Sequence, residues 1–271
     1  YNMAYFITGG TGFIGRNFID RLKEREGDIY VLTRAASMHK FEELQERFGA
    51  DNDRLIPVQG DLHAPLLGLD EATMGDLKGK IRHFCHFAAI YDLKASAEDQ
   101  IRTNNEGTRN AIQLAAALEA GCFQHVSSIA AGGLYKGTFR EDMFEEAEGL
   151  EHPYFATKHD SEGIVRAECQ VPWRIYRPAM VVGHSETGEI DKIDGAYYFF
   201  KSLQKLRNIL PPWFPLVGIE GGKFNNVPVD YVVDAMDHIV HLDDLDGRCF
   251  HLTDTEHHSI GEMMNIFAEA G

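Results

Sequence analysis

The sequence predicts an α/β protein built on a doubly wound parallel sheet, with a small lobe beyond it. Short apolar runs recur along the first two thirds of the chain, and segments with helical spacing separate them. A glycine-rich motif, TGGTGFIG, occupies Thr8–Gly15 between the first apolar run and the first helical segment. Strands that alternate with helices in this way form parallel sheets with helices on both faces.

The apolar runs have the length of buried strands, and the helical segments repeat apolar residues three and four positions apart. The first helix is expected from Phe13, because apolar residues recur at that spacing as far as Leu22. The expected strands are Met3–Ile7, Ile29–Thr33, Leu55–Gln59, Ile81–Phe87, Phe123–Ser127, Trp173–Tyr176 and Cys249–Thr253. The further helices expected are residues 95–119, Tyr154–Glu168, Ala196–Asn208, a helix introduced by Val227-Pro228-Val229-Asp230, and Gly261–Ala270.

The glycine motif predicts a phosphate cradle of the Rossmann type. Backbone N–H groups and the positive end of a helix dipole face an anion at such a turn. Gly9 permits the tight turn, Gly12 lets the backbone approach a pyrophosphate, and Gly15 lets the helix pack on its strand. We therefore expect a nucleotide cofactor at Gly9, Thr11, Gly12, Phe13, Ile14 and Gly15, the alternative being a structural strand-to-helix turn.

The end of the second expected strand predicts that this cofactor is NADPH. Arg34 stands where an Asp or Glu would bind the ribose 2′-hydroxyl of NAD, and a cation there accommodates a 2′-phosphate instead. Ser37 and Lys40 could assist it. The alternative is that Arg34 is only a surface cation.

Several further residues are expected at the carboxyl ends of the parallel strands, where ligands bind. Small residues after the fourth strand leave room for a flat ligand. The residues concerned are Asp61 and Leu62 after the third strand, Ala88 and Ala89 after the fourth, and Pro178 after the sixth.

The order of the expected strands and helices divides the chain into four parts. Residues 1–183 are expected to form the NADP-binding Rossmann domain, residues 184–226 a small, partly discontinuous C-terminal substrate lobe, residues 227–258 a return to the Rossmann body, and residues 259–271 a final helix. The lobe carries an aromatic stripe from Tyr197 to Phe214, which could line an acyl tunnel or form core, and a basic patch of Lys201, Lys205 and Arg207. The abrupt end of the chain suggests truncation from a longer protein.

Composition narrows the classes of partner and location. The net charge of −16 argues against nucleic acid, which is bound by basic faces. The four cysteines include no CxxC pair, which fits a reducing cytosol, and no signal peptide or long apolar run indicates export or a transmembrane segment. His83 and His86 would point to opposite faces of one strand, so we expect no metal site.

Three side chains carry the expected chemistry. Tyr154 and Lys158 lie four residues apart, on one face of a helix, so the ammonium can approach the phenol. A neighbouring cation favours the ionised phenol, and we expect Lys158 to lower the pKa of Tyr154. Ser128, at the end of the fifth strand, could donate a second hydrogen bond to a substrate carbonyl oxygen while Tyr154 protonates it.

These motifs, in this order, resemble the extended short-chain dehydrogenase/reductase family over nearly the whole chain. The resemblance implies that Tyr154 is the catalytic acid/base, that Lys158 also bonds the nicotinamide ribose, and that Ser128 orients the carbonyl. It further implies that Asn104 bends a helix or relays a proton, that Asp61 reaches the adenine, and that a homodimer could form through the helices of Asn104 and Tyr154.

Longer segments around residues 125–162 and 174–204 resemble the N-terminal reductase domain of bacterial two-domain, alcohol-forming fatty acyl-CoA reductases. This likeness implies a further C-terminal reductase domain in the full-length chain. The expected activity is NADPH-dependent reduction of a long-chain fatty aldehyde, or of a fatty acyl-CoA through the aldehyde, to the alcohol. The alternatives are a nucleotide-sugar epimerase or dehydratase of the same family, and a non-catalytic NADPH sensor.

Overall fold

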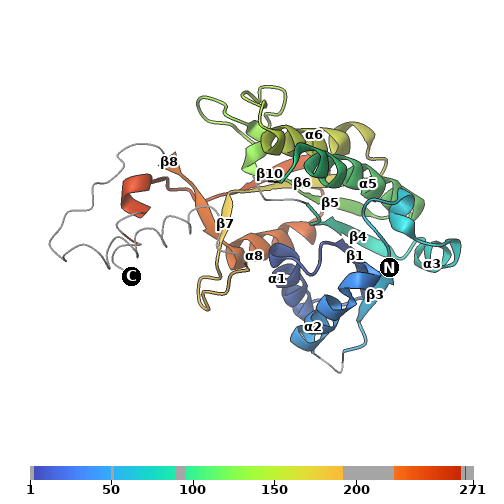
Figure 1. The fold of residues 1–271 in the computed structure, drawn as a ribbon. Helices are drawn as coiled ribbons and strands as arrows, with labels where there is room; N and C mark the ends of the chain where they lie inside the picture. The colour runs from blue at the N-terminus through green and yellow to red at the C-terminus, as the bar shows by residue number, and fades with distance from the viewer. Residues whose placement is uncertain (1–2, 50–51, 90–94, 192–222, 264–265, 267–271) are drawn as a thin grey trace.

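The core of the computed structural model is a seven-stranded parallel sheet (Figure 1). The structure describes residues 3–49, 52–89, 95–191, 223–263 and 266. The strand order in the sheet is β10-β6-β5-β4-β1-β2-β3. Strands β2 and β3 lie on one side of β1 and the later strands on the other, so the strand order changes direction between β1 and β4. The strands are β1 (Ala4–Thr8), β2 (Ile29–Thr33), β3 (Leu55–Gln59), β4 (Ile81–His86), β5 (Cys122–Val126), β6 (Trp173–Pro178) and β10 (Arg248–Leu252).

Helices cover both faces of the sheet, and each layer buries its own apolar cluster (Figure 1). One face carries α1 (Phe13–Arg21), α2 (Met38–Phe48) and α8 (Val229–Val240). The other carries α3 (Glu71–Leu77), α5 (Gly107–Ala117) and α6 (Pro153–Glu168). Removing these apolar side chains from water is the main force that holds the layers together. The doubly wound parallel sheet predicted from the sequence is therefore confirmed.

The predicted strands all occur, with ends that move by one or two residues. The largest difference is in the long helix expected over residues 95–119. It is divided into α4 (Ala97–Gln100), the π-helix η4 (Ile101–Glu106) and α5. A π-turn widens the helix locally and is frequent at functional sites. Asn104 lies within it and is buried.

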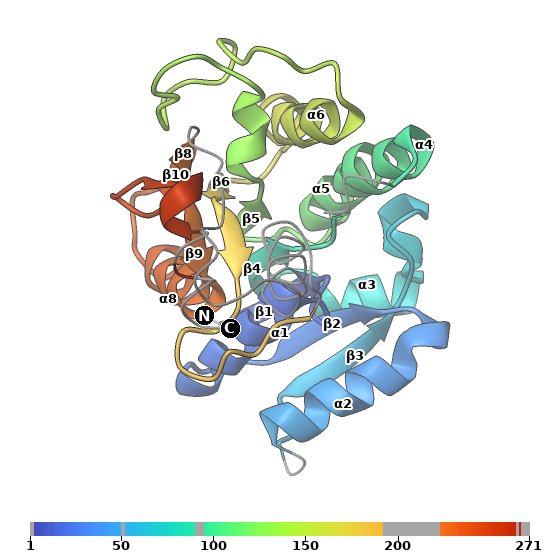
Figure 2. The ribbon, with the colours of Figure 1, turned by 60° about the vertical axis from the view of Figure 1, so that its left-hand side comes forward.

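Short elements that the sequence reasoning missed lie beyond β6. The strands β7 (Met180–Val182) and β9 (Asn226–Pro228) pair in parallel, and β8 (Lys223–Phe224) pairs antiparallel with β11 (His258–Ser259). They project from the body on the same side (Figures 1 and 2). The expected helix Ala196–Asn208, the aromatic stripe and the basic patch fall outside the described residues, as does most of the last helix, of which residues 260–263 are helical. The four-part division stays a prediction.

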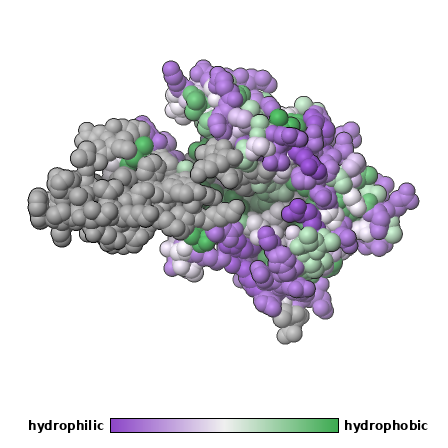
Figure 3. All heavy atoms as spheres, viewed as in Figure 1, coloured by the Kyte–Doolittle hydropathy of each residue, from purple (hydrophilic) through white to green (hydrophobic). Residues whose placement is uncertain are grey.

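Short 3₁₀ turns complete the described fold: η1 (Leu22–Glu24), η2 (Ala35–Ser37), η3 (Pro65–Gly68) and η5 (Ile129–Gly132). The surface in the view of Figure 1 is mainly hydrophilic, with hydrophobic residues visible in a recess near its middle (Figure 3). No helix among the described residues is long and apolar enough to cross a membrane.

Mild acid should destabilise the fold, because three buried histidines are held neutral. Burial lowers the pKa of His83 and of His125 to about 3, and that of His86 well below its usual value. Histidines in an unfolded chain titrate near pH 6.5. The contribution of these histidines to stability is therefore complete above about pH 6.5 and falls as the pH drops toward about 3, by about 1.4 kcal/mol per pH unit for each histidine. Urea unfolding at several pH values measures this slope.

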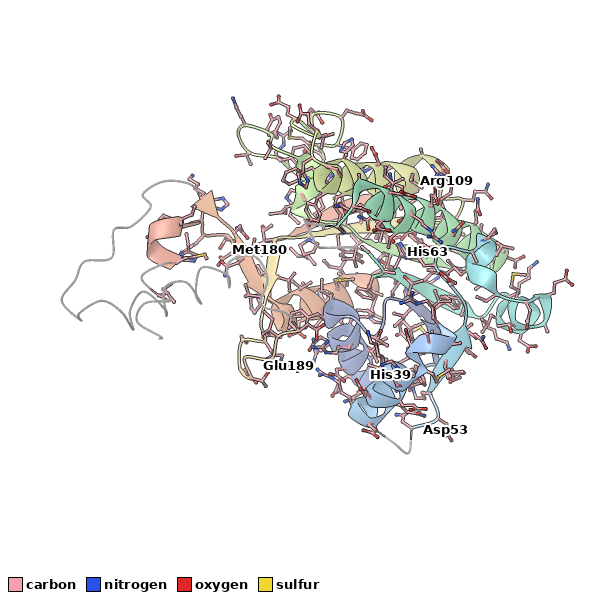
Figure 4. All side chains as sticks on the ribbon, viewed as in Figure 1. His39, Asp53, His63, Arg109, Met180 and Glu189 are labelled. Carbon is pink, nitrogen blue, oxygen red and sulfur yellow. The ribbon has the colours of Figure 1, made fainter. Side chains whose placement is uncertain are left out.

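A matched pair of variants identifies the source of the slope. Neither ring nitrogen of the buried His125 has a hydrogen-bond partner among the described residues, so His125→Phe should reduce the slope by about 1.4 kcal/mol per pH unit while preserving the fold at neutral pH. The exposed His39, labelled in Figure 4, serves as the control, and His39→Gln should leave the slope unchanged. Equal slopes in both variants would refute the assignment.

Candidate active site

The glycine turn after β1 has the geometry that a dinucleotide phosphate requires. Gly9 has a φ of +70°, and a Cβ placed on it would lie 2.6 Å from the backbone nitrogen of Ala88. A Cβ on Gly15 would lie 2.2 Å from the Gly9 carbonyl oxygen, so Gly15 is needed for packing against the turn itself. Among the described atoms, a Cβ on Gly12 would meet only the Gly9 oxygen, at 3.3 Å, which leaves the outer side of Gly12 open to a ligand.

The start of α1 leaves N–H groups available to an anion. Gly12 is the N-cap residue, and no side chain in the described part of the chain caps the helix. The first intrahelical bond runs from the Arg16 N–H to the Gly12 carbonyl at 2.9 Å, so the N–H groups of Phe13, Ile14 and Gly15 precede the helical ladder. Thr11 is half-buried in the turn beside them. These residues fit a pyrophosphate.

Arg34 and Asp61 lie at the carboxyl ends of the neighbouring strands β2 and β3. Both line a groove of about 980 Å³, together with Gly60 between them. Arg34 is exposed, and the Asp61 carboxylate accepts the His63 N–H at 2.9 Å. Leu62 turns toward α5, where a Cβ on Gly107 would lie 2.8 Å from its side chain. The groove runs along β2 and β3 and is bordered on one side by α3, with Asp70, Thr73 and Leu77 in its lining.

A buried hydrogen-bonded chain, which the sequence reasoning missed, fixes Ala88. The Ala88 N–H donates to Thr8 Oγ1 at 3.4 Å, and Thr8 donates to His86 Nδ1 at 2.7 Å. His86 Nε2 lies 3.1 Å from Thr108 Oγ1, which itself donates to the Asn104 carbonyl at 2.6 Å. The last bond uses the threonine hydrogen, so Nε2 carries the histidine proton. Ala89 follows Ala88 at this edge of the sheet, half-buried.

Tyr154, Lys158 and Ser128 come together at the same edge. Ser128 lies close enough to Tyr154 to favour the ionised phenol, and its hydroxyl oxygen accepts the Ala130 N–H at 3.1 Å. Lys158 is 1% exposed, and burial lowers its pKa to about 7. Pro178 ends β6 at this edge and is buried. Because all strands of the sheet are parallel, these side chains lie at the same edge as the glycine turn.

The pKa of Tyr154 differs from the expectation. We expect Lys158 to lower it, but burial raises the pKa of Tyr154 above its usual value, and the interaction with Ser128 only partly opposes this. The expectation was wrong because it ignored desolvation, which disfavours both the phenolate and the ammonium. Near neutral pH the phenol therefore holds its proton and can donate it.

Asn104 joins the π-helix to the catalytic helix. Its Nδ2 donates to Thr157 Oγ1 at 3.1 Å, and Thr157 precedes Lys158 on α6. The resemblance implied a helix-bending or proton-relay position, and the residue does lie in an irregular helix turn that contacts α6. A relay role stays a prediction.

The loop after β7 is tied to the helices beside the glycine turn. Glu189 forms ion pairs with Arg16 of α1 at 3.1 Å and with Arg47 of α2 at 2.7 Å, and Asp191 also pairs with Arg16. Figure 2 shows this loop passing α1, and Figure 4 labels Glu189 in it. No group of three or more His, Cys, Asp or Glu side chains in the described part of the chain could hold a metal ion.

The fold and the site define a nucleotide-dependent oxidoreductase of the extended short-chain dehydrogenase/reductase type. Residues 7–236 match the family model described as male sterility protein, an NAD-binding domain. The chain belongs to this family.

Similar proteins of known class include large peptide synthetases and fatty acyl-CoA reductases. The chain is 33% identical over 207 residues to a linear gramicidin synthase of Brevibacillus parabrevis, covering 70% of this chain and 4% of that protein. It is 26% identical over 279 residues to a putative fatty acyl-CoA reductase of Drosophila melanogaster, covering 85% and 50%. The chain thus spans half or less of the length of these relatives.

Among solved structures, the terminal R domain of the myxalamid PKS-NRPS pathway superposes with a TM-score of 0.84 at 26% identity, covering 100% of this chain and 70% of that one. A UDP-glucuronic acid 4-epimerase from Bacillus cereus, with NAD in its structure, superposes with a TM-score of 0.74 at 17% identity, covering 98% and 82%. The second likeness shows the fold alone.

Proposed function

We propose that the protein is an NADPH-dependent reductase that converts a long-chain fatty aldehyde, or a fatty acyl-CoA through the aldehyde, to the alcohol. The observation that carries the proposal is the position of Tyr154 next to Ser128 and one helical turn from the buried Lys158, at the same edge as the glycine turn. The relatives described as putative fatty acyl-CoA reductases support it.

Each side chain has a separate task in this mechanism. Bound NADPH would supply a hydride to the carbonyl carbon. Ser128 would hold the carbonyl oxygen, and Tyr154 would protonate it as negative charge develops. The ammonium form of Lys158 would favour the phenolate that remains on Tyr154 after this transfer. Asn104 would hold α6 in place through Thr157.

The glycine turn and Arg34 would hold the cofactor. The N–H groups at the start of α1 would bind the pyrophosphate, Arg34 the 2′-phosphate, and Asp61 the adenosine end. Ala88 and Pro178 would border the nicotinamide end.

Oxidation of NADPH tests the reaction class. The protein is mixed with NADPH and decanal, with NADPH and decanoyl-CoA, and with NADPH and UDP-glucuronic acid, and absorbance of the reduced cofactor is followed. We expect net oxidation with decanal, and the ratio of the first two rates separates aldehyde from thioester as substrate. A nucleotide-sugar epimerase, the second candidate, regenerates its cofactor and would give no net oxidation with any of the three.

Cofactor selectivity tests Arg34 separately. Arg34→Ala should weaken NADPH binding by about 10- to 100-fold and leave NADH binding within about twofold, because a charge-assisted bond to the 2′-phosphate contributes about 1.5–3 kcal/mol. Fluorescence titration with both cofactors measures the change. Arg248→Ala is the matched control, because Arg248 is an exposed cation at the opposite end of a strand, the start of β10. Equal weakening of NADPH and NADH binding by Arg34→Ala would contradict the assignment.

A further inference from the structure

One turn beyond Lys158, helix α6 carries a carboxylate that is completely buried. The Glu162 side chain has no exposed surface. Its Oε2 accepts the Ser127 hydroxyl at 2.8 Å and the Arg177 Nε at 3.0 Å, and its Oε1 accepts a second Arg177 nitrogen, Nη2. Arg166 also donates to Oε1, at 2.8 Å. A buried carboxylate with so many donors is held in one geometry.

Arg177 also donates hydrogen bonds to residues other than Glu162. Arg177 is the largest fully buried side chain among the described residues. Its Nη2 also donates to the Met143 carbonyl at 2.9 Å, and its Nη1 lies 3.2 Å from His251 Nε2. The guanidinium therefore joins α6 to the loop before it and to β10, as well as to its own strand β6.

Every segment that meets at Glu162 carries a residue of the proposed site. Ser127 directly precedes Ser128, Arg177 directly precedes Pro178, and Glu162 lies on the helix of Tyr154 and Lys158. We infer that Glu162 and Arg177 are positioning residues, which set the register of α6 against β5 and β6 and thereby hold Tyr154 at Ser128. The inference rests on the proposed function and adds to it two residues that bind neither cofactor nor substrate.

Glu162 keeps its negative charge at neutral pH, which the ion pair with Arg177 requires. Burial alone would raise the pKa of Glu162, but the hydrogen bonds and charge of Arg177, with Arg166 and Ser127, outweigh burial and hold it below its usual value. The carboxylate is therefore ionised at neutral pH, as two-pronged binding by a guanidinium requires.

Arg166 provides an internal control, because its hydrogen bonds with the same carboxylate stay within α6, whereas it meets β6 through a cation–π contact with Trp173. It lies four residues after Glu162 on α6, and its side chain is 26% exposed. Its bonds with Glu162 stay within one helix. A lysine at position 166 would keep a cation near Trp173 and would leave the hydrogen bonds of Glu162 with Ser127 and Arg177 in place.

The test compares Arg177→Lys with Arg166→Lys by steady-state kinetics at a temperature where both are folded. Lysine cannot bind a carboxylate with two parallel bonds, so Arg177→Lys should lower kcat with decanal by about 10- to 100-fold, the loss that a small misplacement of catalytic groups causes. The Kd for NADPH should stay within about twofold in both variants, and kcat should stay within about twofold in Arg166→Lys. Equal kcat values for the two variants would overturn the inference.

Hydrogen exchange gives a readout that does not depend on turnover. Amides of residues 153–162 should exchange faster in Arg177→Lys than in Arg166→Lys, while those of α5 stay protected. Glu162→Gln, which keeps the size and the Ser127 bond, should show the same pattern and serves if Arg177→Lys fails to fold. A wild type without NADPH oxidation would refute the proposed function, and unchanged exchange would refute the positioning role.

Discussion

Replacing Tyr154 with phenylalanine should lower kcat by about 100- to 10,000-fold, the usual contribution of general acid catalysis. The substitution removes only the phenolic oxygen, and with it the interaction with Ser128. The ring and its edge contact with Phe155 remain, so α6 should keep its position. NADPH affinity should therefore change by less than about threefold, because the expected cofactor contacts lie mainly on the glycine turn. Stopped-flow turnover and fluorescence titration give the two quantities.

The control for this prediction is Tyr231→Phe. Tyr231 is 44% exposed on α8, its hydroxyl donates to the Thr253 carbonyl at 3.4 Å, and it has no part in the proposed proton transfer or cofactor binding. This variant should retain full turnover. Wild-type turnover in Tyr154→Phe would exclude Tyr154 as the proton donor, and a parallel loss of NADPH binding would show that the phenol supports the cofactor rather than the chemistry.

Replacing Gly15 with alanine should have the largest effect on cofactor binding. The new methyl group would lie 2.2 Å from the Gly9 carbonyl oxygen and 3.0 Å from the Gly10 Cα, and backbone atoms cannot rotate away as a flexible side chain would. Overpacking of this kind costs about 1–3 kcal/mol or more. The turn must open, so the Kd for NADPH should rise by about 100-fold. Calorimetry and thermal unfolding measure both effects.

Substitutions at two other glycines serve as controls, because they show whether weaker NADPH binding in Gly15→Ala comes from a distorted turn. Gly75 lies in α3, where an added methyl group would have no atom of the described residues within 4 Å, so Gly75→Ala should stabilise the helix by about 0.5–1 kcal/mol and leave binding unchanged. Gly12→Ala should weaken NADPH binding with little loss of stability, because its methyl group would meet one atom at 3.3 Å. Tight NADPH binding by Gly15→Ala would show that the glycine turn does not hold the cofactor.

Local sequence patterns predicted the strands well, because a buried parallel strand is a continuous apolar run. The ends were less certain: β6 continues through Arg177, a charged residue that a buried partner makes possible at the centre of the protein. The π-turn at Asn104 and the pairing of β7 with β9 depend on contacts between segments far apart in the sequence. Neither leaves a periodic signal.

In the site, too, the features that could be predicted are local in sequence, and those that were missed depend on distant contacts. Glycine spacing and the Tyr154–Lys158 interval were readable because the chemistry lies within a few residues. The Glu162–Arg177 pair was not found, although both residues were visible, because nothing local indicates that a carboxylate is buried. The pKa of Tyr154 moved against expectation for a related reason: desolvation depends on the whole fold, whereas the proximity of a lysine depends on one helical turn.

Isotope transfer tests the central claim most directly. The protein is incubated with decanal and NADPH deuterated at C4 of the nicotinamide, on either face in separate reactions, and the alcohol is examined by mass spectrometry. We expect one deuterium at C1 of the product from one of the two labelled cofactors and none from the other. Decanol without deuterium from either cofactor, or no decanol at all, would contradict hydride transfer from a bound nicotinamide to an external carbonyl.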